Sequence, residues 1–238
     1  MPTILLNRVL DPSARYAPQG FTWLGRIGAL QTFGIVSRKS PVQTVAQAKV
    51  TEIPMGAAQG VGTGSNVIMA LNGLVGTKFL LVKGYKSVSE SGLALERGEV
   101  QGISSTSWEY LENKGWIARQ EIGFLYVIGL ARNPKIPDTP TIGELAGNDG
   151  DRDVLRAIAS ASDVGRALLA PPNIPPERAA ALRQAFTAMM QDPEFVREAS
   201  RRNVELEPLA GEPLQRLVVE TMDVTPDVAE RTRRVIRQ

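Results

Sequence analysis

Gly56-Ala57-Ala58-Gln59-Gly60-Val61-Gly62-Thr63-Gly64-Ser65-Asn66 is the stretch on which the interpretation of this chain depends. The apolar run 53–58 leads into the glycine-rich loop and predicts a strand, and the apolar residues 67–72 after it predict a helix. Ser65 or Asn66 is expected to cap that helix. The unbonded backbone N–H groups and the dipole at such a helix start suit an anion. A strand-to-helix turn that binds nothing fits the same stretch equally well.

Two further strand–loop–helix units follow the first. Apolar strands are expected at 77–82 and 99–104, each followed by a polar loop and a helical pattern, with Ser89 or Ser91 as the cap of the second helix. Three such units in succession predict parallel α/β architecture. In parallel sheets ligands bind outside the carboxyl ends of the strands, and all three polar loops are expected at those ends.

The remaining chain is less regular. Residues 1–32 are expected to be irregular apart from a short strand near 21–25, and the strand 33–36 is followed by the charged step Arg38-Lys39. The apolar run 122–131 is interpreted as a strand that crosses between domains, and 204–207 as a short strand. We expect two lobes, one formed by residues 37–125 and the other by 1–36 with 126–238.

Composition excludes several classes of function. The net charge is only +2 and aromatic residues make up 5% of the 238 residues, which argues against nucleic-acid binding. The chain has no cysteine and no histidine, so thiol nucleophiles, Ser-His-Asp triads and cysteine- or histidine-based metal sites are excluded. Enzymes that use carboxylates or lysine remain possible. No run of 18 apolar residues predicts a membrane span, and the first eight residues do not have the pattern of a signal peptide.

Five segments, taken in order, resemble a known family. They lie in the region from about residue 20 to about residue 220, and they are 77–85, 93–102, Ile136-Pro137-Asp138-Thr139-Pro140-Thr141, 171–186 and Asp192-Pro193-Glu194-Phe195. Together they resemble the substrate-binding receptors of tripartite tricarboxylate transporters, also called Bug proteins. The resemblance implies a type II periplasmic binding protein fold: two α/β lobes with a small organic acid in the cleft. It further implies no cofactor, no enzymatic activity, a periplasmic location and membrane transporter subunits as partners.

The chain departs from the family pattern at its start. An export signal, a first strand and a Gly-Gly-x-x-Asp loop are expected there, and the sequence contains none of them. We therefore expect the first lobe to be N-terminally incomplete, with unpaired strand edges, weak ligand binding and little closure.

Eight residues are candidates for contact with the ligand. They come from the three polar loops: Gln59, Thr63, Gly64, Ser65, Tyr85, Ser105, Ser107 and Trp108. Helix capping is the alternative role for the hydroxyl residues, and packing is the alternative for the two aromatic residues. Arg132 and Arg166 are weaker candidates for a bidentate bond to a carboxylate.

Two other functions stay open. Gly60-Val61-Gly62-Thr63-Gly64 partly matches a dinucleotide-binding loop, although Ser65 stands where the third glycine is expected, so a nucleotide-binding enzyme is one alternative. The other alternative is a fragment without ligand activity that serves only as an interaction surface.

Overall fold

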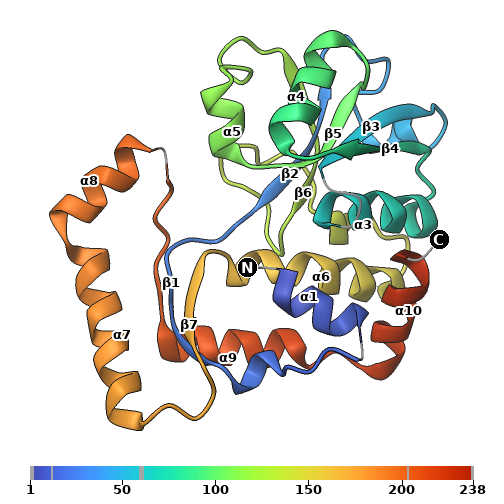
Figure 1. Ribbon diagram of the computed structural model, residues 1–238. Helices are drawn as coiled ribbons and strands as arrows, with labels where there is room; N and C mark the ends of the chain where they lie inside the picture. Colours follow the sequence, from blue (N-terminus) through green and yellow to red (C-terminus); the bar gives the residue numbers. More distant parts are fainter. Residues whose placement is uncertain (1–2, 12, 59–61, 203, 237–238) are drawn as a thin grey trace. The chain divides into compact units, whose positions relative to one another are not determined.

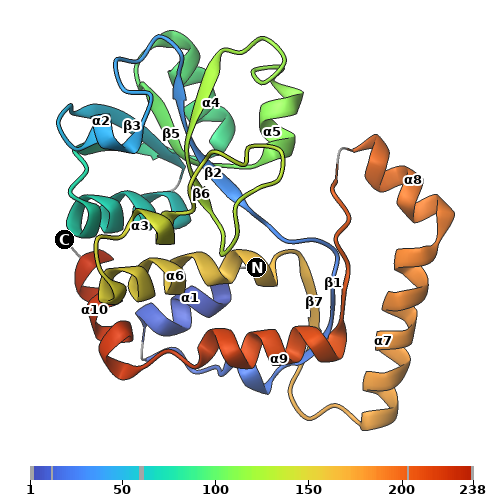
Figure 2. The ribbon, with the colours of Figure 1, turned by 180° about the vertical axis from the view of Figure 1, so that it is seen from behind.

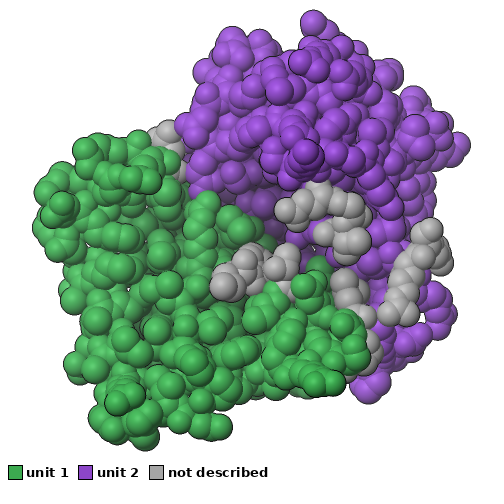
Figure 3. Space-filling view, viewed as in Figure 1, with its two compact units in different colours: residues 1–30, 160–225 green, residues 31–159, 226–238 purple. Residues whose placement is uncertain are grey.

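The computed structural model describes residues 3–11, 13–58, 62–202 and 204–236. The chain divides into two compact units, which Figure 3 shows in different colours. Unit 1 consists of residues 1–30 and 160–225, and unit 2 of residues 31–159 and 226–238. Within the described ranges, every helix is too short or too polar to cross a membrane.

Unit 2 is built on a five-stranded sheet with the order β4-β3-β5-β2-β6. Its strands are β2 (Thr32–Ser37), β3 (Ile53–Ala58), β4 (Phe79–Tyr85), β5 (Gly102–Thr106) and β6 (Ile122–Ile128). β3 runs parallel to β4 and β5, whereas β2 runs antiparallel to β5 and β6. The carboxyl ends of four strands therefore meet the beginning of β2 at one edge, named here the carboxyl edge. The opposite edge is named the amino edge.

α3 (Thr63–Ala70) and α4 (Val88–Arg97) pack against this sheet (Figures 1 and 2). The other helical elements of unit 2 are α2 (Val45–Ala48), a π-helical turn (Leu71–Val75), α5 (Trp108–Asn113), a 3-10 turn (Ile142–Leu145), the first part of α6 (Asp149–Val164) and α10 (Pro226–Ile236). β4 and β5 lie on opposite sides of β3, so the right-handed crossovers place α3 and α4 on opposite faces. α10 packs beside α3.

The core of unit 2 holds the strands and helices in this arrangement. An apolar cluster that includes Phe33, Leu95 and Trp116 fills the space under α4 and α5. Tyr126 is completely buried, and its hydroxyl donates to the Ser104 carbonyl at 3.0 Å. A Cβ atom at position 34 would lie 2.1 Å from the Tyr126 ring, so only glycine lets β2 and β6 approach this closely.

Unit 1 contains a smaller antiparallel sheet with the order β7-β1-β8. Its elements are α1 (Thr3–Leu10), a 3-10 turn (Pro18–Gly20), β1 (Thr22–Arg26), β7 (Ala167–Ala170), α7 (Pro176–Gln191), α8 (Pro193–Arg201), β8 (Leu209–Ala210) and α9 (Gly211–Met222). Trp23 on β1 is completely buried, and its indole N–H donates to the Pro18 carbonyl at 2.9 Å. The Phe186 ring of α7 fits against Gly25, where a Cβ atom would lie 2.1 Å from it.

Four predictions about the elements need correction. The first residues form α1 instead of an irregular segment, and 204–207 is not a strand. The run that starts at Ile122 forms β6 inside the unit 2 sheet and does not cross between domains. The predicted lobes, 37–125 and 1–36 with 126–238, differ from the two units because β2 and β6 pair with each other in the same sheet.

Candidate functional site

The carboxyl edge of the unit 2 sheet brings the candidate residues of three loops together. α3 follows β3, α4 follows β4 and α5 follows β5, and these three strands are parallel. All three helices therefore begin at this edge, where their unbonded N–H groups and positive dipole ends lie. The beginning of β2 adds two residues that the sequence did not suggest, Gln31 and Thr32.

The start of α3 differs from the prediction. Its N-cap is Gly62, whose backbone is extended, and no side chain of the described residues caps the helix. Ser65 and Asn66, the predicted caps, lie in the first turn and are buried. Thr63 is half-buried at the first helical position. Whether these residues contact a ligand remains a prediction, and Gln59 lies outside the described residues.

Gly64 allows α3 to sit directly on the end of β5. A Cβ atom at this position would lie 2.4 Å from the Ser104 Oγ and 3.4 Å from the Ser105 Cβ. The Ser104 hydroxyl is itself fixed, because it donates to the Gly56 carbonyl of β3 at 3.1 Å. The glycine that the sequence suggested for close approach of a ligand thus serves close approach of a helix to a strand.

α4 and α5, in contrast to α3, are capped by their own serines. Ser87 accepts from the Glu90 N–H at 3.3 Å, so it is the cap instead of the predicted Ser89 or Ser91. Ser107 accepts from the Tyr110 N–H at 3.3 Å, which is the capping alternative considered for it.

Ser105 and the beginning of β2 are joined by side chains at the carboxyl edge. The Ser105 hydroxyl donates to the Thr32 Oγ1 at 3.0 Å. The Gln31 amide donates to the Ala131 carbonyl at 2.9 Å and accepts from the Asn133 amide at 2.9 Å. These bonds connect the end of β5, the beginning of β2 and the segment after β6. No sequence signal marked Gln31 and Thr32, because only the pairing of β2 with β5 and β6 brings them here.

The side chains of Tyr85 and Trp108, two of the predicted ligand contacts, both pack against the core cluster. Tyr85 is aligned with Ala58, but a Cβ atom at Gly56 would lie 3.4 Å from its ring, and the residue packs against the core cluster. Burial, and then the charge of Glu99, raises the pKa of the Tyr85 hydroxyl, which therefore stays protonated at neutral pH. Tyr85 thus retains a proton that it can donate to an acceptor.

Trp108 is held by partners on several sides. Its ring stacks on Phe124 at a centroid distance of 5.7 Å and meets Phe33 edge-on at 5.7 Å. Its indole N–H donates to Glu112 at 2.6 Å, and the Lys135 ammonium lies 4.8 Å from the ring centroid. The structure therefore favours packing as its main role, and ligand contact remains a prediction.

The arginine considered for a carboxylate fork already binds a carboxylate of this chain. Arg132 donates from its Nε to both Glu144 oxygens at 3.0 Å, and its Nη2 lies 2.9 Å from the same group. The Arg132 side chain and the Thr141 N–H lower the pKa of Glu144, and the carboxylate raises the pKa of Arg132. Arg166, the second such candidate, lies in unit 1.

Two buried oxygens near the carboxyl edge lack a hydrogen-bond partner among the described residues. They are the Asn66 Oδ1 in the first turn of α3 and the Thr106 Oγ1 at the end of β5. Buried polar atoms are normally hydrogen-bonded, so both oxygens have an unused capacity to accept a hydrogen bond. The described residues contain no group of three or more acidic side chains that could hold a metal ion.

Comparisons with known proteins support the fold. No family model matches the sequence, and no curated protein matches it significantly. A TctC solute-binding protein from Polaromonas is similar in structure with a TM-score of 0.69 at 17% identity, over 99% of this chain and 75% of that one. An R. palustris protein solved with adipate has a TM-score of 0.61 at 21% identity, over 95% and 73%. MatC from Rhodopseudomonas palustris, solved with malate, has a TM-score of 0.57 at 21% identity, over 96% and 74%. The chain therefore has the type II periplasmic binding protein fold, in the form found in TctC-type solute-binding proteins.

Proposed function

We propose that this chain is a solute-binding protein that captures a small organic acid at the carboxyl edge of unit 2. One observation carries the proposal: within the described part of the chain α3 starts at this edge without a side-chain cap, whereas α4 and α5 beside it are capped by Ser87 and Ser107. An uncapped helix start has N–H groups available for an anion, and a ligand carboxylate supplies the oxygens that a cap would supply.

The surroundings of α3 suit a carboxylate with further polar contacts. The Thr63 hydroxyl lies at the first position of the helix, and Ser105 lies on the adjoining strand end. The buried Asn66 Oδ1 and Thr106 Oγ1 have no partner among the described residues, so each can still accept a hydrogen bond. These described residues thus offer neutral donors and acceptors to a carboxylate.

The structural likenesses support the class of ligand. The two R. palustris proteins were solved with adipate and with malate, both of which are small dicarboxylates. We propose a ligand of the same chemical class here, with binding and release as the whole activity and without enzymatic chemistry or a cofactor. Delivery to membrane subunits of a tripartite tricarboxylate-type transporter in the periplasm is the corresponding biological role.

Calorimetric titration with matched ligands tests the proposal. Adipate, malate and succinate are compared with 1,6-hexanediol and adipamide, which keep the adipate chain length but lack its charge. We expect heat of binding for at least one acid and none for the two neutral compounds. Binding of NAD or ATP in place of the acids would support a nucleotide-binding protein instead. A flat trace with every compound would overturn the proposal.

A further inference from the structure

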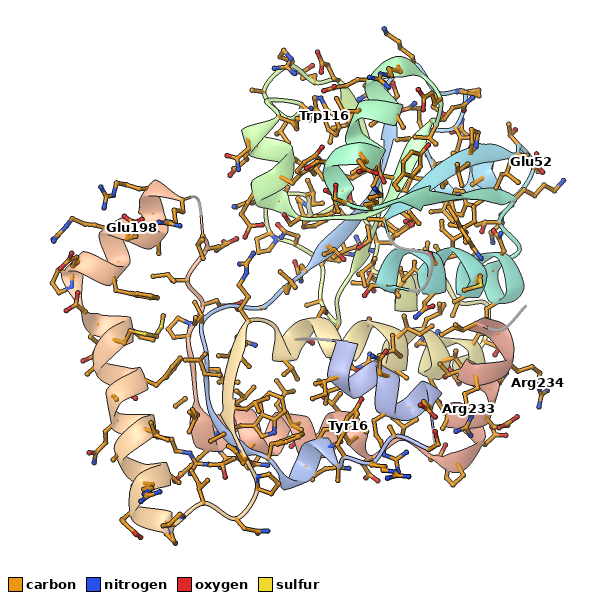
Figure 4. All side chains as sticks on the ribbon, viewed as in Figure 1. Tyr16, Glu52, Trp116, Glu198, Arg233 and Arg234 are labelled. Atoms are coloured by element: carbon orange, nitrogen blue, oxygen red, sulfur yellow. The ribbon has the colours of Figure 1, made fainter. Side chains whose placement is uncertain are left out.

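A second cavity lies at the amino edge of the unit 2 sheet, on the side opposite to the proposed acid site. Its volume is about 650 Å³, which is the size of ordinary small-molecule sites. It is bounded by the loop after β2, the end of α4 and the segment before β6. Leu95, Val100 and Ile122 contribute an apolar floor, together with Trp116, which is labelled in Figure 4.

The charged side chains around this amino-edge cavity are not all paired with an opposite charge. Glu96 is paired with Lys114 at 2.8 Å, and Glu121 is paired with Arg119 at 2.8 Å. Arg97, which also lines the cavity, lies 3.8 Å from Glu99. Among the residues that the structure describes, Lys39 lines the cavity without an ion-pair partner within 4.0 Å. The guanidinium of the neighbouring Arg38 lies against Gly123, on the face of the sheet away from Ile122. The unpaired charge that faces the cavity is therefore positive.

The loop that carries the two cations is held in place. The Gln43 side-chain amide donates to the Ser37 carbonyl at 2.9 Å and to the Ser40 carbonyl at 2.8 Å, so it closes the loop across its ends. The Arg38 N–H donates to the Glu121 carbonyl at 2.9 Å, which ties the loop to the residue before β6. A loop fixed in this way loses little freedom when a ligand binds.

Two glutamines complete the lining. Gln101 accepts from the Ser40 hydroxyl at 3.1 Å, which leaves its Nε2 as a donor at the cavity. Gln120 has a φ of 53°, a left-handed conformation that is uncommon for a residue other than glycine. Such strained residues concentrate at ligand sites, where the surrounding structure maintains them.

We propose that the amino-edge cavity binds an organic anion with an apolar body. Lys39 holds its anionic oxygens, Gln101 donates a further hydrogen bond, and the body lies over Leu95 and Val100. The anionic group of the ligand is complementary to the cation, and its apolar body is complementary to the floor of the cavity. A cation alone would suit an inorganic ion, and an apolar floor alone would suit a neutral compound. The inference does not rest on the proposed acid site, which uses other residues.

Titration followed by ¹⁵N nuclear magnetic resonance tests this inference with benzoate and phenyl phosphate as probes. The probes are added separately and compared with benzyl alcohol, which has the same ring without the charge. We expect the side-chain signals of Gln101 and Trp116 to shift with both anions and to remain unchanged with the alcohol. A preference between carboxylate and phosphate identifies the head group.

A double variant and a charge-matched control locate the anion. Arg38→Gln with Lys39→Gln removes two exposed charges and is expected to weaken both probes by about tenfold or more, the loss that follows removal of charged hydrogen bonds. Lys49→Gln with Lys78→Gln removes the same charge from exposed positions of unit 2 outside the cavity and is expected to change nothing. Absence of any shift, equal shifts with benzyl alcohol, or unchanged affinity in the first double variant would each overturn the proposal.

Discussion

The two edges of the unit 2 sheet attract an anion by different means. At the carboxyl edge the helices begin, α3 has no side-chain cap among the described residues, and the arginine nearby is already paired with Glu144. At the amino edge α3, α4 and α5 end, so their dipoles disfavour an anion, and the ammonium group of Lys39 has to supply the attraction. One sheet can therefore present a backbone site at one edge and a side-chain site at the other.

The difference predicts how each edge responds to change. A backbone site depends on how closely the chain segments approach one another, so added volume damages it more than loss of a charge does. A side-chain site depends on charges that project from a fixed loop, so substitutions remove it without disturbing the fold.

Gly64→Val is expected to have the largest effect. The new side chain would start 2.4 Å from the Ser104 Oγ, and α3 has to move away from β5. We expect loss of acid binding and destabilisation by about 1–3 kcal/mol, measured by calorimetry and urea unfolding. Gly147→Val is the matched control, because a Cβ atom there would meet no described atom within 4 Å. Wild-type acid binding by Gly64→Val would show that α3 does not form the site, and benzoate binding at the amino edge should survive in both variants.

Thr63→Val tests the hydroxyl at the start of α3 with almost no change of volume. Loss of a hydrogen bond to a charged group is expected to weaken acid binding by about tenfold. Thr51→Val replaces an exposed threonine of unit 2 outside the edge and is expected to leave the affinity unchanged. Equal affinities for all three proteins would remove Thr63 from the site.

Ser65→Ala is the companion variant: the side chain is completely buried, so we expect its effect in the melting temperature more than in the affinity.

Added salt should weaken anion binding at the two edges to different extents. Raising the ionic strength from about 0.05 M to about 0.5 M shortens the screening length several-fold, which weakens attraction to exposed cations. We expect benzoate binding at Lys39 to weaken several-fold, and acid binding by the neutral donors near α3 to change less. Parallel salt dependences in the two titrations would show that the edges do not differ in this respect.

Glu144→Gln is expected to have the smallest effect. Arg132 lowers the folded-state pKa of Glu144, so the pair stabilises the protein above the unfolded pKa and the contribution is lost as the pH falls through the lowered folded value. Both side chains are largely exposed, so the contribution is below about 1 kcal/mol. Urea unfolding of wild type and variant should differ at neutral pH and converge in acid. A difference that persists in acid would contradict this account. The variant also releases Arg132, so acid binding at the carboxyl edge should become more sensitive to salt.

The sequence predicted the local elements of unit 2 well. The strand before the glycine-rich loop and the helix that ends at Arg97-Gly98 were expected and are present as β3 and α4. Gly98 has the positive φ that ends a helix, and such a conformational requirement is visible in the residue type itself. The parallel arrangement followed from the repeated order of strand, loop and helix.

Features that depend on distant pairing could not be predicted. β2 and β6 belong to one sheet only because segments about 90 residues apart in the sequence pair, and no local pattern names the partner. For the same reason Gln31 and Thr32 gave no signal, and Arg38-Lys39 resembled an ordinary charged surface step. The cap of α3 was misplaced because Ser65 is a favourable capping residue. The helix instead starts at Thr63, two residues before Ser65, and its N-cap is Gly62 in an extended conformation.

The long sequence separation between β2 and its partner strands has a consequence for the chain while it is being synthesised. β2 ends at Ser37, but its first partner begins at Gly102 and its second at Ile122. At about 5–20 residues per second, the apolar segment Thr32–Ser37 waits several seconds on the ribosome without a neighbour. An unpaired apolar strand in a nascent chain promotes aggregation, and charged residues directly beside such a strand counteract it. Arg38 and Lys39 stand at that position, so Lys39, the cation that lines the amino-edge cavity in the folded protein, also helps to protect β2 before its partners have been made.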